Sequence, residues 1–366
     1  MESVSYVDIS AQWRDERNDL LPILEETLSG GQYVGGSEVD LFEEAASRYF
    51  GSKHVVGLNS GTDALVCALV ALGVGPGDEV ITPPNSFIAS TAAIVHIGAK
   101  PVFVDVKSDQ NIDEHLIEAA IGPKTKAIMP VHLTGRMASL REVGKIAEKH
   151  SLAIIEDAAQ SAGSSLDSRF AGTWGDVGCF SAHPLKNLNA CGDAGFITTD
   201  NESVAKKIRS MRNHGLIDRE TVEEFGFVSR MDAVQAAVLK FRLERLSNVV
   251  AKRKENVAVY RTLLNASHIF HPEDAQGEDN SWHTFVIQVD QRDELKRYLA
   301  EKGIETAIHY PVPIHLQPAA RALGYQEGDF PIAESQAMRI LTLPIHQYLT
   351  KEALERVALS VNEFYK

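Results

Sequence analysis

Hydrophobic positions in the first half of the chain follow two alternating spacings. Short apolar runs, typical of strands buried on both faces, lie at residues 54–58, 77–83, 101–105, 126–131, 152–157 and 195–199. Before and between them, apolar residues recur at helical spacing in residues 14–28, 37–50, 64–72, 115–120, 140–149 and 205–211, and another helix opens at residues 85–90. This alternation predicts an α/β fold with a mostly parallel sheet covered by helices on both faces.

The pattern changes after residue 230. Residues 230–263 contain neither glycine nor proline and predict one long helix, of the kind that often connects two domains. Beyond it we expect a half-exposed strand at 282–289, a strand at 304–310, and helices at 293–302, 331–340 and 351–365. The sequence therefore predicts a large domain at residues 1–245, including an N-terminal helical segment, and a smaller α+β domain at residues 246–366.

Length and charge narrow the classes of function. A chain of 366 residues is long enough for about two domains, each with its own core. The net charge of −14 argues against nucleic acid as the main partner. Three scattered cysteines, Cys67, Cys179 and Cys191, are typical of a reducing compartment. Because residues 1–13 lack a signal-peptide pattern and no apolar run is long enough to span a bilayer, we expect a cytoplasmic protein without membrane contact.

The candidate chemistry lies between residues 151 and 199. A predicted strand delivers Asp157 at its C-terminal end, and Lys186 follows on a later loop in a segment with few charges. An aldehyde cofactor held as an imine requires a partly desolvated lysine, and a buried aspartate stabilises the proton on a pyridine nitrogen. The pair is what a pyridoxal phosphate (PLP) site requires. Taken singly, Asp157 is better explained as a helix N-cap, and Lys186 as a solvated surface lysine.

Two further segments follow predicted strands. Asn59-Ser-Gly-Thr-Asp63 joins a strand to a helix N-terminus, where Gly61 and Thr62 offer backbone N–H groups and a hydroxyl to a phosphate. An ordinary strand–helix turn is the alternative. Phe87 lies just past another strand, where it either stacks on a planar ring or packs in the core. Asp157 and Gln160 also lie where a predicted strand leads into a helix. All these candidate residues therefore lie at strand-to-helix junctions.

Several common motifs are absent from the sequence. The turn at residues 59–63 is neither a Walker A loop nor a Gly-x-Gly-x-x-Gly turn, so the sequence lacks the motifs that usually indicate binding of nucleotide triphosphates or dinucleotides. No Gly-x-Ser-x-Gly elbow supports a serine hydrolase. His309 and His315 have no acid or cysteine at a suitable spacing, and we therefore expect no metal site.

Motifs along nearly the whole chain match one known family. They are Tyr33-Val-Gly-Gly-Ser-Glu-Val39, Asn59-Ser-Gly-Thr-Asp-Ala-Leu65, Gly77-Asp-Glu-Val-Ile81, Ser86-Phe-Ile-Ala-Ser90, Glu156-Asp-Ala-Ala-Gln160, Ser181 with Lys186, Gly192-Asp-Ala-Gly195, Ser229-Arg-Met-Asp232 with Gln235-Ala-Ala237, and Leu341-Thr-Leu-Pro-Ile-His346. Each is weak alone, but together they are highly specific. With them the chain resembles the DegT/DnrJ/EryC1/StrS family of PLP-dependent sugar aminotransferases, which have the aspartate aminotransferase-like fold (fold type I).

The resemblance implies a role for each matching position. Lys186 would carry PLP covalently as an internal aldimine and would move a proton between the cofactor and substrate carbons. Asp157 would pair with the pyridinium nitrogen, Gln160 would reach the ring hydroxyl, and Phe87 would stack on the ring. The phosphate would be held by three residues: Gly61, Thr62 and Ser181.

The resemblance also implies the reaction and the partners. An amino acid, usually L-glutamate, would give its amino group to the cofactor, which would then aminate a keto group on a nucleotide-linked sugar. The product would serve the biosynthesis of an amino or deoxy sugar for a surface polysaccharide or a glycosylated metabolite. The family works as homodimers with sites at the interface, so we expect a homodimer. Arg230, His309 and Tyr310 are candidates for contacts with the substrate.

Two positions depart from the family pattern. Many members have an asparagine where this chain has Val228, and they use it on the cofactor phosphate of the neighbouring subunit, so that side-chain contact is missing or replaced here. The usual Gly-Glu-Gly-Gly or Gly-Asp-Gly-Gly motif reads Gly192-Asp-Ala-Gly195, which adds one methyl group near the cofactor. Neither change undermines the assignment.

Other activities remain open as alternatives. A subgroup of the family dehydrates sugars and replaces the lysine with histidine, so the presence of Lys186 favours transamination. A cyclitol ketone or another cyclic keto compound is an alternative acceptor. A regulatory protein with this fold but without turnover is less well supported, because a protein that only binds need not retain Asp157 and Lys186 together.

Overall fold

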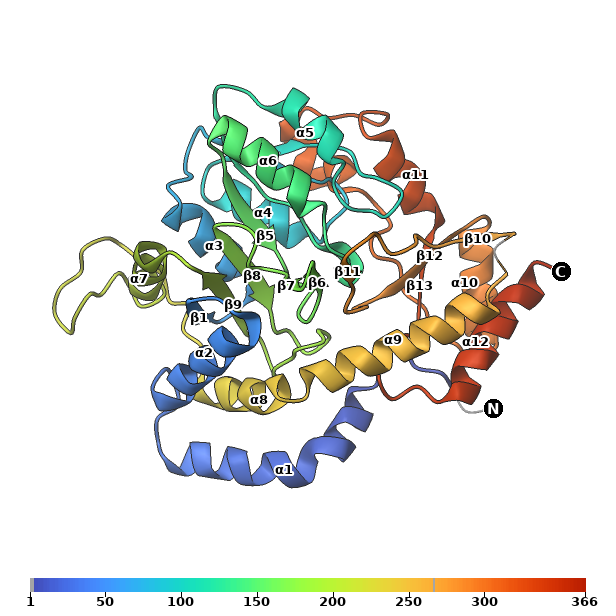
Figure 1. Ribbon diagram of the computed structural model, residues 1–366, viewed down its shortest axis with the longest axis horizontal. Coiled ribbons are helices and arrows are strands. Elements are labelled where there is room, and N and C mark those ends of the chain that lie inside the picture. The colour runs from blue at the N-terminus through green and yellow to red at the C-terminus, as the bar shows by residue number, and fades with distance from the viewer. Residues whose placement is uncertain (1–2, 266) are drawn as a thin grey trace.

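The computed structural model describes residues 3–265 and 267–366 and contains a central seven-stranded sheet (Figure 1). Its strands lie in the order β1-β9-β8-β5-β4-β2-β3: β1 (His54–Leu58), β2 (Glu79–Thr82), β3 (Lys100–Phe103), β4 (Thr125–Ile128), β5 (Ala153–Asp157), β8 (Val177–Ser181) and β9 (Gly195–Thr199). Neighbouring strands are parallel except at β9, which is antiparallel to both β1 and β8. The predicted α/β fold with a mostly parallel sheet is confirmed.

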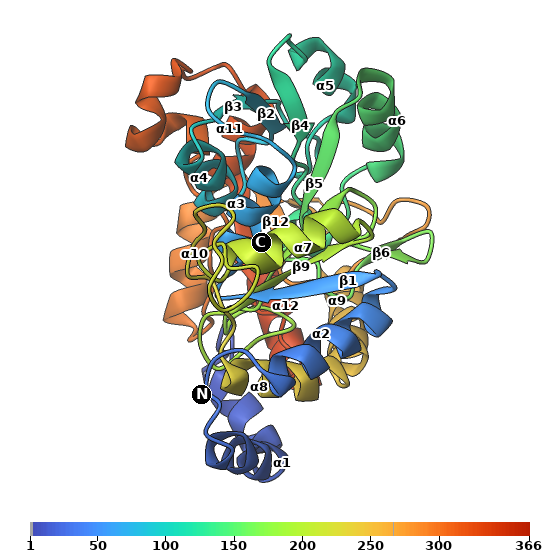
Figure 2. The same cartoon turned by 90° about the vertical axis from the view of Figure 1, so that its left-hand side faces the viewer.

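Helices cover both faces of this sheet because each has an apolar side to bury. On one face, α3 (Gly61–Ala71), α4 (Ile88–His96) and α7 (Glu202–Met211) share a core with the strands. On the other, the helices are α2 (Ser37–Phe50), α5 (Glu114–Ala120), α6 (Leu140–His150) and α8 (Ala233–Leu243). The N-terminal helix α1 (Ile9–Ser29) packs outside α8 (Figure 2).

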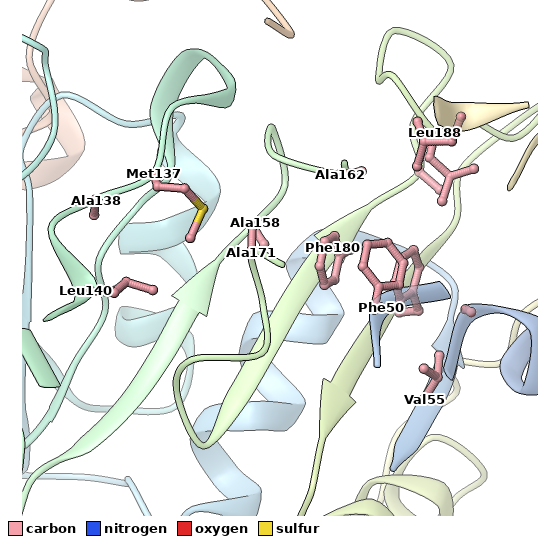
Figure 3. Packing of buried hydrophobic residues seen from close by; sticks show 14 of the residues in the cluster. Phe50, Val55, Met137, Ala138, Leu140, Ala158, Ala162, Ala171, Phe180 and Leu188 are labelled. Carbon is pink, nitrogen blue, oxygen red and sulfur yellow. The ribbon is translucent and has the colours of Figure 1, made fainter. Parts of the chain in front are cut away.

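Four phenylalanines form the aromatic centre of one of these cores. The rings of Phe180 on β8 and Phe196 on β9 stack with centroids 4.6 Å apart, and Phe50 of α2 lies 4.9 Å from Phe180. Phe42 meets Phe196 edge-on. Figure 3 shows Phe50 beside Phe180 within the cluster. This packing ties α2 to the two strands that flank the loop carrying Lys186.

A second core lies in the C-terminal part of the chain. It is built by the sheet β10-β12-β13 (Ile269–Phe270, Phe285–Val289 and Ile340–Leu343) and by α9 (Leu246–Leu263), α10 (Arg292–Glu301) and α12 (Lys351–Phe364). The remaining elements are α11 (Pro331–Arg339), the short strands β6 (Ser165–Leu166), β7 (Arg169–Phe170) and β11 (Glu278–Asp279), and three 3-10 turns at Leu133–Gly135, Ile314–Leu316 and Pro318–Leu323. The domain division at 245/246 stays a prediction, although α9 does begin at Leu246.

The single helix predicted at residues 230–263 is wrong. The chain forms α8 and α9, which are separated at Glu244 and Arg245 and run in different directions (Figure 1). α8 packs chiefly against α2 and α1 beside the first core, whereas much of α9 packs against the second core. One straight helix cannot serve both surfaces. Arg245 marks the turn, with its guanidinium over the Phe241 ring and bonded to Asp19.

Two strand predictions in the second core also need correction. Residues 304–310 do not form a strand, since Ile304 and Ala307 make only isolated bridges, to Val4 and Thr342. The predicted half-exposed strand at 282–289 is the shorter β12, and all five of its residues are buried because it is the central strand between β10 and β13. Strands β8 and β13 were not predicted.

No helix among the described residues is both long enough and apolar enough to cross a membrane.

The aromatic centre gives a stability prediction. Phe180 is 1% exposed, so Phe180→Ala leaves a cavity between β8, β9 and α2. We expect the free energy of unfolding to fall by about 3–5 kcal/mol. Urea denaturation followed by circular dichroism measures this loss, with Phe270→Ala as the control because that ring is 43% exposed. Equal losses in the two variants would contradict the assignment of Phe180 to the core.

Candidate active site

One cavity of about 380 Å³ lies between the seven-stranded sheet and the second core. Nine of the ten predicted site residues line it: Gly61, Thr62, Phe87, Asp157, Gln160, Ser181, Lys186, His309 and Tyr310. Arg230 is not among its lining residues in this chain. That side chain is exposed and reaches Asn213 with its guanidinium, at 3.4 Å. The structure thus brings together all the predicted cofactor residues and two of the three predicted substrate residues.

Asp157 ends β5 and is nearly inaccessible, with 5% of its surface exposed. The hydroxyl of Ser90 donates to its Oδ2 at 2.6 Å, and the backbone N–H of Ala159 donates to its Oδ1 at 3.1 Å. A carboxylate accepts about four hydrogen bonds, so each oxygen retains a lone pair for a further donor. Asp157 is therefore held in one orientation and can still pair with a cationic group in the cavity.

Lys186 lies on the loop between β8 and β9, and a backbone hydrogen bond of 2.8 Å from its N–H to the carbonyl of His183 shapes that loop. Burial lowers the pKa of its amine to about 8, and the nearby charge of Asp157 opposes part of this shift. An ordinary lysine is almost fully protonated at neutral pH. The amine of Lys186 therefore carries a sizeable unprotonated, nucleophilic fraction near pH 8.

The turn between β1 and α3 brings hydrogen-bond donors to the cavity. Ser60 caps α3 by accepting from the N–H of Asp63 at 3.1 Å. No partner for the backbone N–H groups of Gly61 and Thr62 is found in the part of the chain that the structure describes. A Cβ atom on Gly61 would lie 2.7 Å from the Cβ of Ser181, so only glycine lets this helix end approach β8. The N–H groups and the hydroxyls of Thr62 and Ser181 form an anion-binding arrangement.

The rest of the predicted set also lines the cavity. Gln160 accepts from the N–H of Thr134 at 2.8 Å, and its amide donates to the Tyr310 hydroxyl at 3.4 Å. The Phe87 ring is 53% exposed and lies 5.7 Å from the Tyr310 ring. Nδ1 of His309 lies 3.0 Å from the hydroxyl of Thr342. Burial lowers the pKa of His309 to about 4, and the charge of Lys186 contributes, so this imidazole is neutral at physiological pH.

Sequence reasoning missed several residues that line the same cavity: Tyr6, His183, Asp193, Arg253, His283 and His346. Tyr6 precedes α1, and Arg253 lies within the long helix α9. Neither position shows a motif in its own neighbourhood, and only the packing of the second core against the sheet brings them here. Burial and the charges of Lys186 and Arg253 keep the pKa of His283 well below its ordinary value.

The side chains fit the group that the sequence resemblance implies. A phosphate matches the donors of Gly61, Thr62 and Ser181, a protonated pyridine nitrogen matches the buried Asp157, and an aldehyde matches the amine of Lys186. Among the described residues, no cluster of three or more histidine, cysteine or acidic side chains is arranged to hold a metal ion.

Curated relatives match the chain along nearly its full length. It is 39% identical to "dTDP-3-amino-3,4,6-trideoxy-alpha-D-glucose transaminase" of Streptomyces venezuelae, covering 99% of this chain and 96% of the relative. It is 38% identical to "UDP-N-acetyl-3-dehydro-alpha-D-glucosamine 3-aminotranferase" of Acidithiobacillus ferrooxidans (97% and 96%). It is also 38% identical to a "Pleiotropic regulatory protein" of Geobacillus stearothermophilus (100% and 99%).

Solved structures show the same fold. The crystal structure of S. venezuelae DesV in complex with a ketimine intermediate superposes with a TM-score of 0.98 at 39% identity, covering 100% of this chain and 99% of that one. NtdA from Bacillus subtilis, solved with its bound cofactor PMP, gives a TM-score of 0.92 at 34% identity (99% and 85%). A family model matches residues 14–362. The chain belongs to the DegT/DnrJ/EryC1/StrS aminotransferase family.

Proposed function

We propose that this protein is a PLP-dependent aminotransferase that moves an amino group from an amino acid to a keto group of a nucleotide-linked sugar. One observation carries the proposal. A single cavity holds a buried carboxylate, a lysine of lowered pKa and a set of unpaired hydrogen-bond donors that suit a phosphate group. Relatives named as dTDP-sugar and UDP-sugar aminotransferases support the acceptor class. They carry different nucleotides, so the choice between dTDP and UDP stays open.

The side chains divide the work of binding. When bound, PLP supplies an aldehyde for imine chemistry and a ring that accepts electrons. Asp157 would hold a proton at the ring nitrogen, and Ser90 keeps that carboxylate in place. The N–H groups at the start of α3 and the hydroxyls of Thr62 and Ser181 would hold the phosphate. Phe87 would cover the ring, and Gln160 would bind its hydroxyl.

Lys186 has two tasks in this scheme. Its unprotonated amine would form the covalent link that holds the cofactor, and the lowered pKa favours that form of the amine. When it is not engaged in that link, the same amine would accept a proton from one carbon and return it to another. A histidine at this position is the mark of the dehydrating subgroup, so Lys186 favours transamination over dehydration.

The substrates would meet the cofactor within this cavity. We assign L-glutamate as the amino donor, and we place His309 and Tyr310 on the sugar because both line the cavity beside Phe87. Arg230 is exposed and outside this cavity, and we assign it to the acceptor bound in the neighbouring subunit. One relative is named as a regulatory protein, but the presence of Asp157 and Lys186 together in one cavity favours an enzyme here.

We also propose a homodimer in the cytoplasm. The segment after α7 exposes large apolar side chains that a second copy of the chain would cover: Ile217, Val222, Phe225, Phe227 and Val228. Phe225 is 99% exposed, which is unusual for an aromatic ring. Three free cysteines, Cys67, Cys179 and Cys191, agree with a reducing compartment.

The pKa of Lys186 can be measured by chemical labelling. As the pH rises through about 8, the Lys186 amine loses its proton, so its reaction with an amine-specific reagent should reach half its maximum there in the cofactor-free protein. Mass spectrometry follows the labelled peptide, with the exposed Lys351 as an internal control for the labelling reaction. A midpoint for Lys186 near the ordinary lysine value of about 10.4 would contradict its desolvation.

The visible spectrum tests the proposed function directly. The purified protein should be yellow with PLP and should bleach on addition of L-glutamate, because the donor transfers its amine to the cofactor. Lys186→Ala should still fold and bind PLP reversibly, but it should lose transamination to a nucleotide-linked keto sugar by several orders of magnitude. A protein that takes up no PLP, or a Lys186→Ala variant with wild-type turnover, would refute the proposal.

Asp157→Asn tests the proposed role of Asp157 in stabilising a proton on the cofactor's ring nitrogen. The amide is close in size to the carboxylate but carries no negative charge, so it stabilises a protonated pyridine nitrogen far less well. We expect PLP binding to persist and turnover to fall at least ~100-fold. Steady-state assays at saturating PLP measure this, with Asp193→Asn as the control at a more exposed acid of the same cavity. A wild-type rate in Asp157→Asn would exclude the assigned role.

A further inference from the structure

One cation in the cavity wall has no anionic partner. The structure buries four arginines among its described residues, each at most 7% exposed: Arg136, Arg242, Arg253 and Arg292. Arg136 pairs with Asp274 and Glu278, Arg242 with Glu16, and Arg292 with Asp293. Arg253 has no carboxylate within 4.0 Å in residues 3–265 and 267–366. Because burying an unpaired charge is costly, such a position needs a reason.

The guanidinium of Arg253 is held firmly at one nitrogen. Its Nη1 donates to three backbone carbonyls, those of Trp282 at 3.0 Å, His283 at 3.1 Å and Ile345 at 2.7 Å. These bonds fix the plane of the group, but a carbonyl does not neutralise its charge. Nε is buried without a partner, and no acceptor for Nη2 is found among the described residues. A guanidinium has five N–H donors, so three are uncommitted.

Arg253 lies in the wall of the cavity that also holds Lys186. Burial lowers the pKa of His283, another residue of this cavity, and the charges of Lys186 and Arg253 both contribute to the shift. Burial lowers the pKa of Arg253 itself only to about 10, so the group stays charged at neutral pH. Apart from Lys186 and the histidines, it is the one cationic side chain among the described residues that line this cavity.

Three of the four histidines that line the cavity do not supply a competing charge. Burial lowers the pKa of His309 to about 4, and it also lowers the pKa of His283 and of His346. These imidazoles are neutral at physiological pH. Lys186 is committed to the cofactor in the proposed reaction. An anion that enters this part of the cavity therefore has Arg253 as its fixed positive partner.

We propose that Arg253 binds a carboxylate group of the amino-acid donor through Nη2. This inference rests on the proposed transamination, in which a donor such as L-glutamate must place its amine beside Lys186. The carboxylate would neutralise the buried guanidinium, and the three carbonyl bonds at Nη1 would spare it any reorganisation on binding. A nucleotide diphosphate is the other anion of the reaction, and the experiment separates the two.

The test compares Arg253→Gln with wild type in the donor half-reaction. We expect the apparent Kd for L-glutamate, from bleaching rates of the PLP form, to rise about 10- to 100-fold, as for the loss of a charged hydrogen bond. The Kd of maleate, a dicarboxylate that cannot transaminate, should rise in parallel by calorimetry. Arg292→Gln is the matched control, since Arg292 is equally buried and bonds two backbone carbonyls outside the cavity.

Binding of dTDP and UDP provides the second arm. Their affinities should change less than ~3-fold in Arg253→Gln. A loss of nucleotide affinity with unchanged glutamate and maleate affinity would overturn the proposal and assign Arg253 to the diphosphate. Equal losses for both anions, matched by Arg292→Gln, would show a purely structural role and would also overturn it.

Donor analogues identify the carboxylate. 4-Aminobutyrate lacks the α-carboxylate and L-alanine lacks the side-chain carboxylate, so the substitution should leave unaffected only the analogue that lacks the group bound by Arg253. An equal effect on every donor contradicts the proposal. If Arg253→Gln does not fold, a crystal structure of the wild type with 2-oxoglutarate decides the matter by whether a carboxylate oxygen contacts Nη2.

The outcomes also separate this inference from the proposed function. If the wild-type protein binds maleate in an Arg253-dependent way but never bleaches with any amino acid, the carboxylate site is supported and the transaminase proposal is refuted. If the wild-type protein bleaches with L-glutamate and Arg253→Gln does so at the same Kd, the transaminase proposal is supported and the role of Arg253 is refuted.

Discussion

The candidate site depends on a carboxylate that does not line it. Glu156 is fully buried beside Asp157 on β5, and its oxygens accept from the N–H groups of Gly172, Trp174 and Gly175 at 2.6–2.7 Å and meet Nε2 of His132 at 2.8 Å. Nδ1 of His132 accepts from the N–H of Ala138, so the proton lies on Nε2 and points to Glu156. A buried charge is tolerated only when donors surround it, and these donors come from two separate loops.

This network positions residues of the candidate site. The backbone N–H of His132 donates to the carbonyl of Asp157 at 3.0 Å. Two residues later in the same loop, the N–H of Thr134 donates to the side chain of Gln160 and orients it. A close backbone contact between β9 and the start of α3 positions another part of the site. A Cβ atom on Gly195 would lie 2.3 Å from the carbonyl carbon of Ser60, so β9 can reach the start of α3 only without a side chain there. The neighbouring Ala194, a departure from the family motif, is 1% exposed, and its methyl group is accommodated.

The local sequence pattern was sufficient to predict much of this fold. It was insufficient where contacts between distant segments determine the structure. The strand ends that carry Asp157 and the start of α3 were predictable because buried parallel strands read as apolar runs and end at one edge of the sheet. Strand β8 was missed because Val177-Gly-Cys-Phe-Ser181 is short and has neither alternation nor a β-branched run. The helix break at Arg245 was missed because no glycine or proline marks it, and its cause is the position of two separate cores. His132, Glu156 and Arg253 show no local signal of their partners, which lie far away in the chain.

Charge balance distinguishes the two buried cations of the cavity. Burial shifts the pKa of Lys186 to about 8, which leaves the amine able to lose its proton and act as a nucleophile. The same effect on Arg253 reaches only about 10, because a guanidinium starts from a much higher value, so this group stays charged throughout the physiological range. A single desolvated cavity thus holds one cation that can be discharged and one that cannot. The first suits covalent chemistry, and the second suits a fixed anion receptor, which is the division of labour that a reaction between a cofactor aldehyde and an anionic amine donor requires.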